Sequence, residues 1–91
     1  MKITGKVRTK CDVVNGQKAD GAIWSKQTLV VDTLNDHSRP IAMDFFGDDK
    51  VEVLRALAIG QLVDVVCTPE SREYDGRWYT NISGIAVRAY A

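Results

Sequence analysis

The chain has 91 residues, 45% of them hydrophobic, which is enough for the modest core of one domain. Its 12 lysines and arginines balance 12 aspartates and glutamates, which argues against a strong non-specific grip on nucleic acid, although the local placement of charge still matters. No apolar run approaches the roughly 20 residues of a membrane span and the start is too polar for a secretory signal, so we expect a cytoplasmic protein.

Two cysteines lie far apart in the sequence, each in an apolar run typical of a strand. We expect Cys11 and Cys67 to be buried and reduced, and a disulfide between them is the less favoured alternative. Neither has the CxxC or Cys/His spacing of a zinc site. The sequence therefore predicts no metal and no cofactor.

Alternation over residues 3–13 predicts the first strand. One side presents small and apolar residues, namely Ile3, Gly5, Val7, Thr9, Cys11 and Val13. The other side presents three cations, Lys6, Arg8 and Lys10. Two interpretations stay open: a track for phosphates, and a solvated edge that lysines protect from pairing with another sheet.

Residues 15–21 form a polar segment bracketed by glycines, which predicts a loop. A second strand follows over residues 22–33, with Leu29 and Val31 in the core. Trp24 and Lys26 share the opposite face, next to the loop. They form a candidate platform for a nucleobase, and the alternative is that the indole packs beneath the loop.

The only histidine, His37, lies in a predicted polar turn over residues 34–40. Asp36, His37 and Ser38 are chain neighbours, and adjacent side chains do not converge into the hydrogen-bonded line that a nucleophile and its base need. The sequence also lacks a phosphate-cradling glycine loop. We therefore expect a binding protein and no enzyme.

Residues 41–47 predict a third strand in which Ile41, Met43 and Phe45 face inward and Phe46 faces outward. A short helix of about ten residues begins at Asp48-Asp49, where carboxylates suit a helix N-terminus, and stops by Gly60. Its buried stripe is Val51, Leu54, Leu57 and Ala58.

A fourth strand is predicted over residues 61–68, with Pro69 at an edge or bulge, and it resumes as far as Asp75-Gly76. Asp-Gly tolerates the positive φ angles of a tight turn, so a hairpin leads into the fifth strand, residues 77–87, with a bend or bulge at Gly84. The hairpin gathers Arg72, Tyr74, Arg77 and Trp78. Such side chains suit stacking on bases and pairing with phosphates, whereas the alternative places the rings in the core.

This element order favours an all-β fold, a five-stranded OB-fold barrel with one short helix between strands 3 and 4, over residues 1–91 as a single domain. Glycine and proline breaks let five bent strands close and hide their edges. An open β-sandwich fragment and an SH3-like barrel are the alternatives, and the position of the helix disfavours both.

Three segments resemble the second half of bacterial single-stranded-DNA-binding proteins: Phe45-Phe46-Gly47 before the helix, residues 60–65 after it, and Arg77-Trp78-Tyr79-Thr80 in the hairpin. Over essentially the whole chain the sequence is similar to a small uncharacterised family of bacterial and phage OB-fold proteins. That similarity rests on residues 71–82, Lys26-Gln27 and Phe46-Gly47-Asp48.

The resemblance implies a barrel that binds single-stranded DNA, with RNA as the alternative, as a homodimer or higher homo-oligomer. By matched position it implies binding by Trp24, Lys26, Phe46, Arg72, Tyr74, Arg77 and Trp78, to which we add Lys6 and Arg8 for phosphates. Typical replication proteins of this kind carry a long acidic tail and this chain stops at Ala91, which argues against a general replication role and leaves an accessory, plasmid-linked or phage-linked role open. The rival hypothesis is a protein-interaction or self-association module, because OB barrels also bind proteins and Tyr, Trp and Arg are enriched at interfaces.

Overall fold

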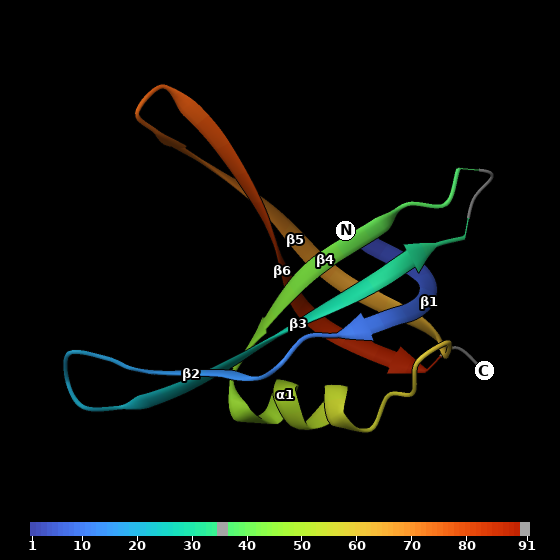
Figure 1. Ribbon diagram of the computed structural model, residues 1–91, viewed down its shortest axis with the longest axis horizontal. Helices are drawn as coiled ribbons and strands as arrows, with labels where there is room; N and C mark the ends of the chain where they lie inside the picture. Colours follow the sequence, from blue (N-terminus) through green and yellow to red (C-terminus); the bar gives the residue numbers. More distant parts are fainter. Residues whose placement is uncertain (35–36, 90–91) are drawn as a thin grey trace.

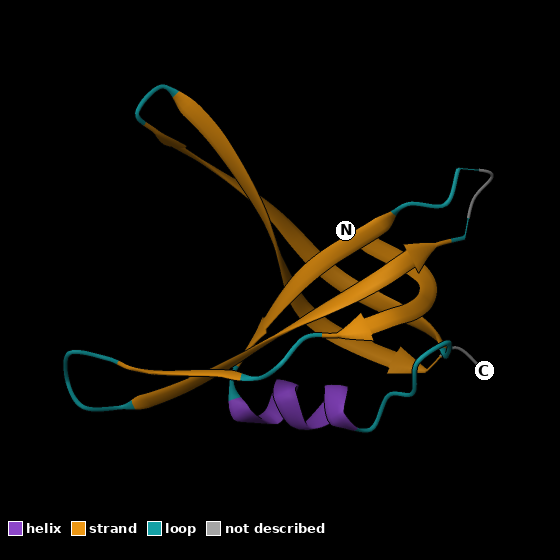
Figure 2. Cartoon of the chain, viewed as in Figure 1, coloured by secondary structure: helices purple, strands orange, loops and turns teal. Residues whose placement is uncertain are grey.

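Five of the six strands close into a barrel (Figures 1 and 2). The computed structural model describes residues 1–34 and 37–89, so Asn35 and Asp36 of the predicted turn and the last two residues lie outside the described part. The elements are β1 (Lys2–Lys10), β2 (Val14–Gln17), β3 (Ile23–Thr33), β4 (Pro40–Phe46), α1 (Asp48–Arg55), β5 (Leu62–Tyr74) and β6 (Arg77–Ala89). The order β1-β5-β6-β4-β3 closes because β3 also pairs with β1. The predicted OB fold, with its helix before the last two strands, is confirmed.

The core fills the ring with alternate residues of the strands. Eight of these side chains are at most 1% exposed: Val7, Leu29, Val31, Met43, Phe45, Val63, Val65 and Cys67. Because successive strand residues point to opposite faces, a period of two in the sequence becomes one apolar inner surface. Leu54 of α1 and Leu57 just beyond it join this cluster, so the helix covers one end of the barrel. The predicted inward positions of the second, third and fourth strands are confirmed at Leu29, Val31, Met43, Phe45, Val63, Val65 and Cys67.

A bulge in β1 changes the side on which its last residues lie. The pairing with β3 shifts register between Val7 and Thr9, so that Lys10, and not Thr9, lies opposite the core residue Leu29. The alternation reverses at this point. For that reason the predicted inward positions at the end of the strand are wrong, and the structure exposes Thr9, Cys11 and Val13. The predicted buried pair of cysteines is therefore half right: both are free, and only Cys67 is buried.

The same bulge gives Lys10 a structural role. Its ammonium donates hydrogen bonds to the carbonyl oxygens of Leu54 at 3.3 Å, Arg55 at 3.5 Å and Leu57 at 2.6 Å. These carbonyls lie at the C-terminal end of α1, where backbone acceptors lack helical partners and a positive charge is favourable. Lys10 thus stabilises the helix end and does not extend a row of cations.

The predicted loop over residues 15–21 is wrong in its first half, because Val14–Gln17 forms β2 and pairs with the start of β3. No residue of this short strand is buried, so the sequence shows no alternation there and hydrogen bonds to β3 provide the order. The helix is also shorter than expected. It ends at Arg55, and Gly60 lies in the connection to β5 with a φ of +87°.

Two hairpin arms project from the barrel on one side (Figure 1). One is the β2–β3 arm, residues 14–26; the other is the β5–β6 arm, residues 68–83, which begins where β5 has passed its last partner in β1. Asp75 and Gly76 have φ angles of 53° and 78°, which confirms the predicted Asp-Gly turn. Pro69 lies at a free edge as predicted, and the register shift next to Gly84 confirms a bulge there.

Candidate nucleic-acid interface

Three predicted site residues meet on the outer face of β3 and β4. Lys26 pairs directly with Phe46, and Trp24 lies two residues away on the same side of β3. The Trp24 and Phe46 ring centroids are 6.3 Å apart with the rings tilted by 56°, and the Lys26 ammonium lies 5.7 Å from the centre of the Phe46 ring. Phe46 is 51% exposed. We call Trp24, Lys26 and Phe46 the aromatic platform.

The neighbouring glycines set the shape of this platform. Gly16 of β2 pairs with Trp24, and a Cβ on Gly16 would lie 2.1 Å from an indole carbon, so the indole rests directly on the β2 backbone. The indole of Trp24 therefore packs on the β2 strand, where the sequence predicted a loop, and it remains half-buried. Beside it lies an open hollow of about 450 Å³ lined by Lys18, Trp24, Phe46 and Gly47. A hollow of that size accommodates a planar base.

The two faces of the β5–β6 arm carry different side chains. Tyr74 pairs with Arg77, and Arg72 pairs with Tyr79, so these four share one face. Trp78 pairs with Glu73 on the other face. The expectation that Trp78 shares a surface with the two arginines is therefore wrong. The two-residue turn fixes this register, because it places the residues flanking Asp75-Gly76 opposite each other.

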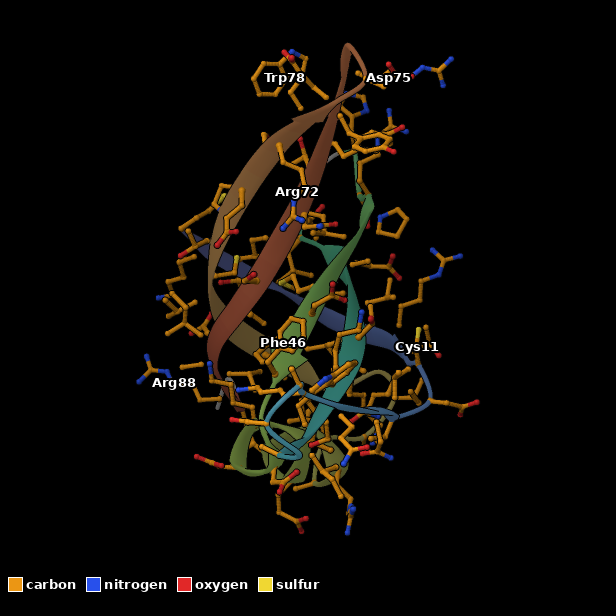
Figure 3. The ribbon with its side chains drawn as sticks, turned by 90° about the vertical axis from the view of Figure 1, so that its left-hand side faces the viewer. Cys11, Phe46, Arg72, Asp75, Trp78 and Arg88 are labelled. Atoms are coloured by element: carbon orange, nitrogen blue, oxygen red, sulfur yellow. The ribbon has the colours of Figure 1, made fainter. Side chains whose placement is uncertain are left out.

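The arginine-bearing face of the arm is continuous with the platform side of the barrel. Asp44 of β4 pairs with Ser83 of β6, which in turn pairs with Thr68 of β5. Paired residues point to the same side of a sheet, so the side that carries Asp44 and Phe46 runs onto the side that carries Arg72. In Figure 3, which looks at the side from which the arms project, Arg72 and Phe46 both face the viewer, with Trp78 near the tip of the arm.

The arm is open to solvent on both faces. Tyr74 is 73% exposed and Trp78 is 68% exposed, which places both rings outside the core. Within residues 1–34 and 37–89, neither Arg72 nor Arg77 forms an ion pair. The arginine-bearing face therefore combines free positive charge with exposed rings.

Two predicted cations lie away from the platform. Lys6 pairs with Asp32, six residues along β3 from Lys26, which is about 20 Å at the rise of an extended strand. Arg8 donates a hydrogen bond to Asp32 at 3.1 Å within an ion pair. The Asp32 carboxylate offsets part of the positive charge of Lys6 and Arg8. This end of the sheet therefore attracts phosphate less than the predicted row of three unpaired cations would.

Sequence reasoning missed two residues of this surface. Tyr79 is 49% exposed and lies beside Arg72, as the register of the Asp-Gly hairpin already implied. Lys18 lines the hollow beside the platform from the loop of the β2–β3 arm, and no pattern in the sequence marks it. Among the described residues, no cluster of His, Cys, Asp or Glu is arranged to hold a metal ion, and no helix has the length and apolarity to cross a membrane.

Comparison with known proteins agrees with this architecture. The chain is similar to the mitochondrial single-stranded DNA-binding protein Rim1 of S. cerevisiae, with a TM-score of 0.70, 13% identity, and coverage of 98% of this chain and 91% of that one. It is also similar to a small single-stranded DNA-binding protein of Streptomyces coelicolor, with a TM-score of 0.60, 19% identity, and coverage of 99% and 90%. At these identities the likeness shows the fold. No curated protein sequence matches the chain. A family model matches residues 2–88, nearly the whole domain, and the chain therefore belongs to the family described as Domain of unknown function (DUF3127).

Proposed function

We propose that this protein binds single-stranded DNA with little dependence on its overall sequence, and that it is not an enzyme. The observation that carries the proposal is the aromatic platform on the outer face of β3 and β4, where the two ring centroids are 6.3 Å apart and a cation lies 5.7 Å from the centre of the Phe46 ring. In OB folds this face and the loops at its two ends are the surfaces that bind oligonucleotides. Here the two arms stand in the place of those loops. The two similar structures are those of proteins named as single-stranded DNA-binding proteins, and this supports the same proposal.

The strand would run from the aromatic platform onto the arginine-bearing face of the β5–β6 arm. Bases stack on Phe46 and Trp24 and on Tyr74, Lys26 lies beside the stacked base, and Arg72 and Arg77 approach the phosphates. Base–aromatic stacking contributes about 1–3 kcal/mol per base and tolerates any base. Trp78, on the other face, takes a base only where the strand wraps around the tip of the arm. Lys6 and Arg8 extend the track at the far end of β3.

A fluorescence titration tests this proposal. In a Trp78→Phe variant, Trp24 is the only indole, so quenching by a dT oligonucleotide reports contact at the platform itself. With three or four phosphates neutralised, the logarithm of the binding constant should fall with the logarithm of salt concentration with a slope of about −2 to −3. Absence of quenching at low salt would contradict the proposal, and an RNA oligonucleotide of the same sequence shows which strand is preferred.

A second candidate, self-association, is favoured by Trp78. This ring is 68% exposed and lies opposite Glu73, on an arm face without arginine, which suits a protein partner better than phosphate. We propose that Trp78 contributes to a homodimer or higher homo-oligomer, in which several sites on one strand raise the affinity. Sedimentation of the wild type and of Trp78→Ser tests this: the variant should shift to a smaller species, and a monomeric wild type would contradict it.

A further inference from the structure

A carboxylate lies on the surface where DNA phosphates would approach. Asp44 is on β4 two residues before Phe46, on the same outer face, and its side chain is 27% exposed. Its Oδ1 accepts a hydrogen bond from the Thr28 hydroxyl at 2.6 Å. Its Oδ2 lies 4.0 Å from the Lys26 ammonium, which is beyond hydrogen-bond distance. Within the described residues, Oδ2 accepts no hydrogen bond.

Lys26 and Asp44 together are better suited to hydrogen bonding with the edge of a base than to binding a phosphate. The negative charge of Asp44 offsets the attraction of Lys26 for phosphate, and an ionised carboxylate only accepts hydrogen bonds. Lys26, 30% exposed on its side chain, only donates them. The two side chains therefore present a donor and an acceptor next to each other, both reachable from solvent. The 4.0 Å gap leaves each free to bond to a ligand.

A base on the platform would bring its polar edge to this pair. Lys26 is opposite Phe46, and Asp44 is about 7 Å along the strand from Phe46, a distance close to the width of a purine. Guanine has a carbonyl acceptor, O6, followed by two adjacent donors, N1–H and N2–H. One ammonium and one carboxylate match that sequence of groups. Thymine offers a single N–H between two carbonyl oxygens, and those oxygens repel a carboxylate.

We propose that Lys26 and Asp44 form a base-reading pair on the aromatic platform, which makes the protein prefer guanine over thymine at one position of the bound strand. Lys26 donates to O6 and Asp44 accepts from N1–H and N2–H. Thr28 is a positioning residue, since its hydroxyl holds Asp44 in place. This inference rests on the proposed binding of single strands and adds a base preference to it.

The test compares three 12-nucleotide DNA strands by fluorescence anisotropy, in lithium buffer so that guanines do not form quadruplexes. The strands are alternating thymidine–deoxyguanosine, alternating thymidine–deoxyinosine, and oligo-dT; hypoxanthine lacks the N2 amino group. Wild-type protein should bind the guanine strand about tenfold more tightly than oligo-dT, with the inosine strand between them.

Two matched variants identify the residue responsible. Asp44→Asn replaces an acceptor by a donor and should bring the guanine and oligo-dT affinities within about twofold, with an oligo-dT affinity no weaker than that of the wild type. Asp32→Asn makes the same change at a carboxylate farther along the outer face of β3, paired with Arg8, and should leave the preference intact.

The possible failures separate the two proposals. Equal wild-type affinity for all three strands overturns base reading and leaves the binding function standing. An Asp44→Asn variant that loses affinity equally for every strand also overturns it, because that result assigns Asp44 a structural role only. No binding to any strand overturns both proposals.

Discussion

Phe45 and Phe46 are adjacent in β4, and substituting each in turn separates an effect on DNA binding from an effect on protein stability. Phe45 is 1% exposed in the core, whereas Phe46 is 51% exposed on the aromatic platform. We predict that Phe46→Leu, which keeps an apolar side chain but removes the planar ring, weakens binding of oligo-dT with little loss of stability. Phe45→Leu, the same change one residue earlier, should do the reverse.

The magnitudes follow from what each ring contacts. Loss of one stacked base costs about 1–3 kcal/mol, which is roughly a 5- to 150-fold weaker dissociation constant. Phe46 also loses its contacts with Trp24 and Lys26, which are worth about 1 kcal/mol of unfolding free energy for an exposed pair. Phe45→Leu leaves unfilled volume in a close-packed core and should lower the unfolding free energy by about 1–3 kcal/mol.

Two measurements decide the outcome. Fluorescence anisotropy with labelled oligo-dT gives the dissociation constants, and urea unfolding gives the free energies, both at a temperature where all variants are folded. A Phe46→Leu protein that binds as tightly as wild type would refute the assignment of this ring to stacking. So would equal loss of affinity in both variants, because that result reports a general loosening of β4.

Further predictions concern the scaffold. Lys10→Met removes the donor at the end of α1 and should lower the unfolding free energy by about 1–3 kcal/mol in urea without changing the dissociation constant; no effect would contradict the capping role. Gly84→Ala would place a Cβ 2.2 Å from the Phe45 ring and should cost about 1–3 kcal/mol, and an unchanged unfolding midpoint would exclude that contact. Burial raises the pKa of the Cys67 thiol, so a thiol reagent should modify only Cys11 in the native protein, and modification of two thiols would contradict this. The Cys67 thiol therefore loses its proton at a lower pH in the unfolded state than in the native state. The unfolding free energy should then fall as the pH rises above the ordinary thiol pKa of 9.0, and a constant unfolding free energy over that range would contradict this prediction.

The barrel could be predicted because its core obeys a period of two. Met43 and Phe45 are separated by Asp44, and Val63 and Val65 by Asp64, and the members of each pair enter the core together. The Asp-Gly turn was equally readable, since few residue pairs accept two consecutive positive φ angles. Where these local rules act alone, sequence and structure agree.

The errors arise where one element depends on another. The bulge in β1 reverses the direction of Lys10, and no residue type at Arg8 signals it. The strand β2 lacks any buried residue, so only its hydrogen bonds to β3 create it. Trp78 is a different case: the turn length determines its pairing with Glu73, so its position could have been derived by counting from Asp75-Gly76.

An NMR titration of the ¹⁵N-labelled protein with oligo-dT tests directly whether a single strand binds at the aromatic platform. Amide shifts should concentrate at Trp24, Lys26 and Phe46 and along the arginine-bearing face of the β5–β6 arm, near Arg72 and Tyr79. Shifts confined to α1, or no shifts at low salt, would contradict binding there.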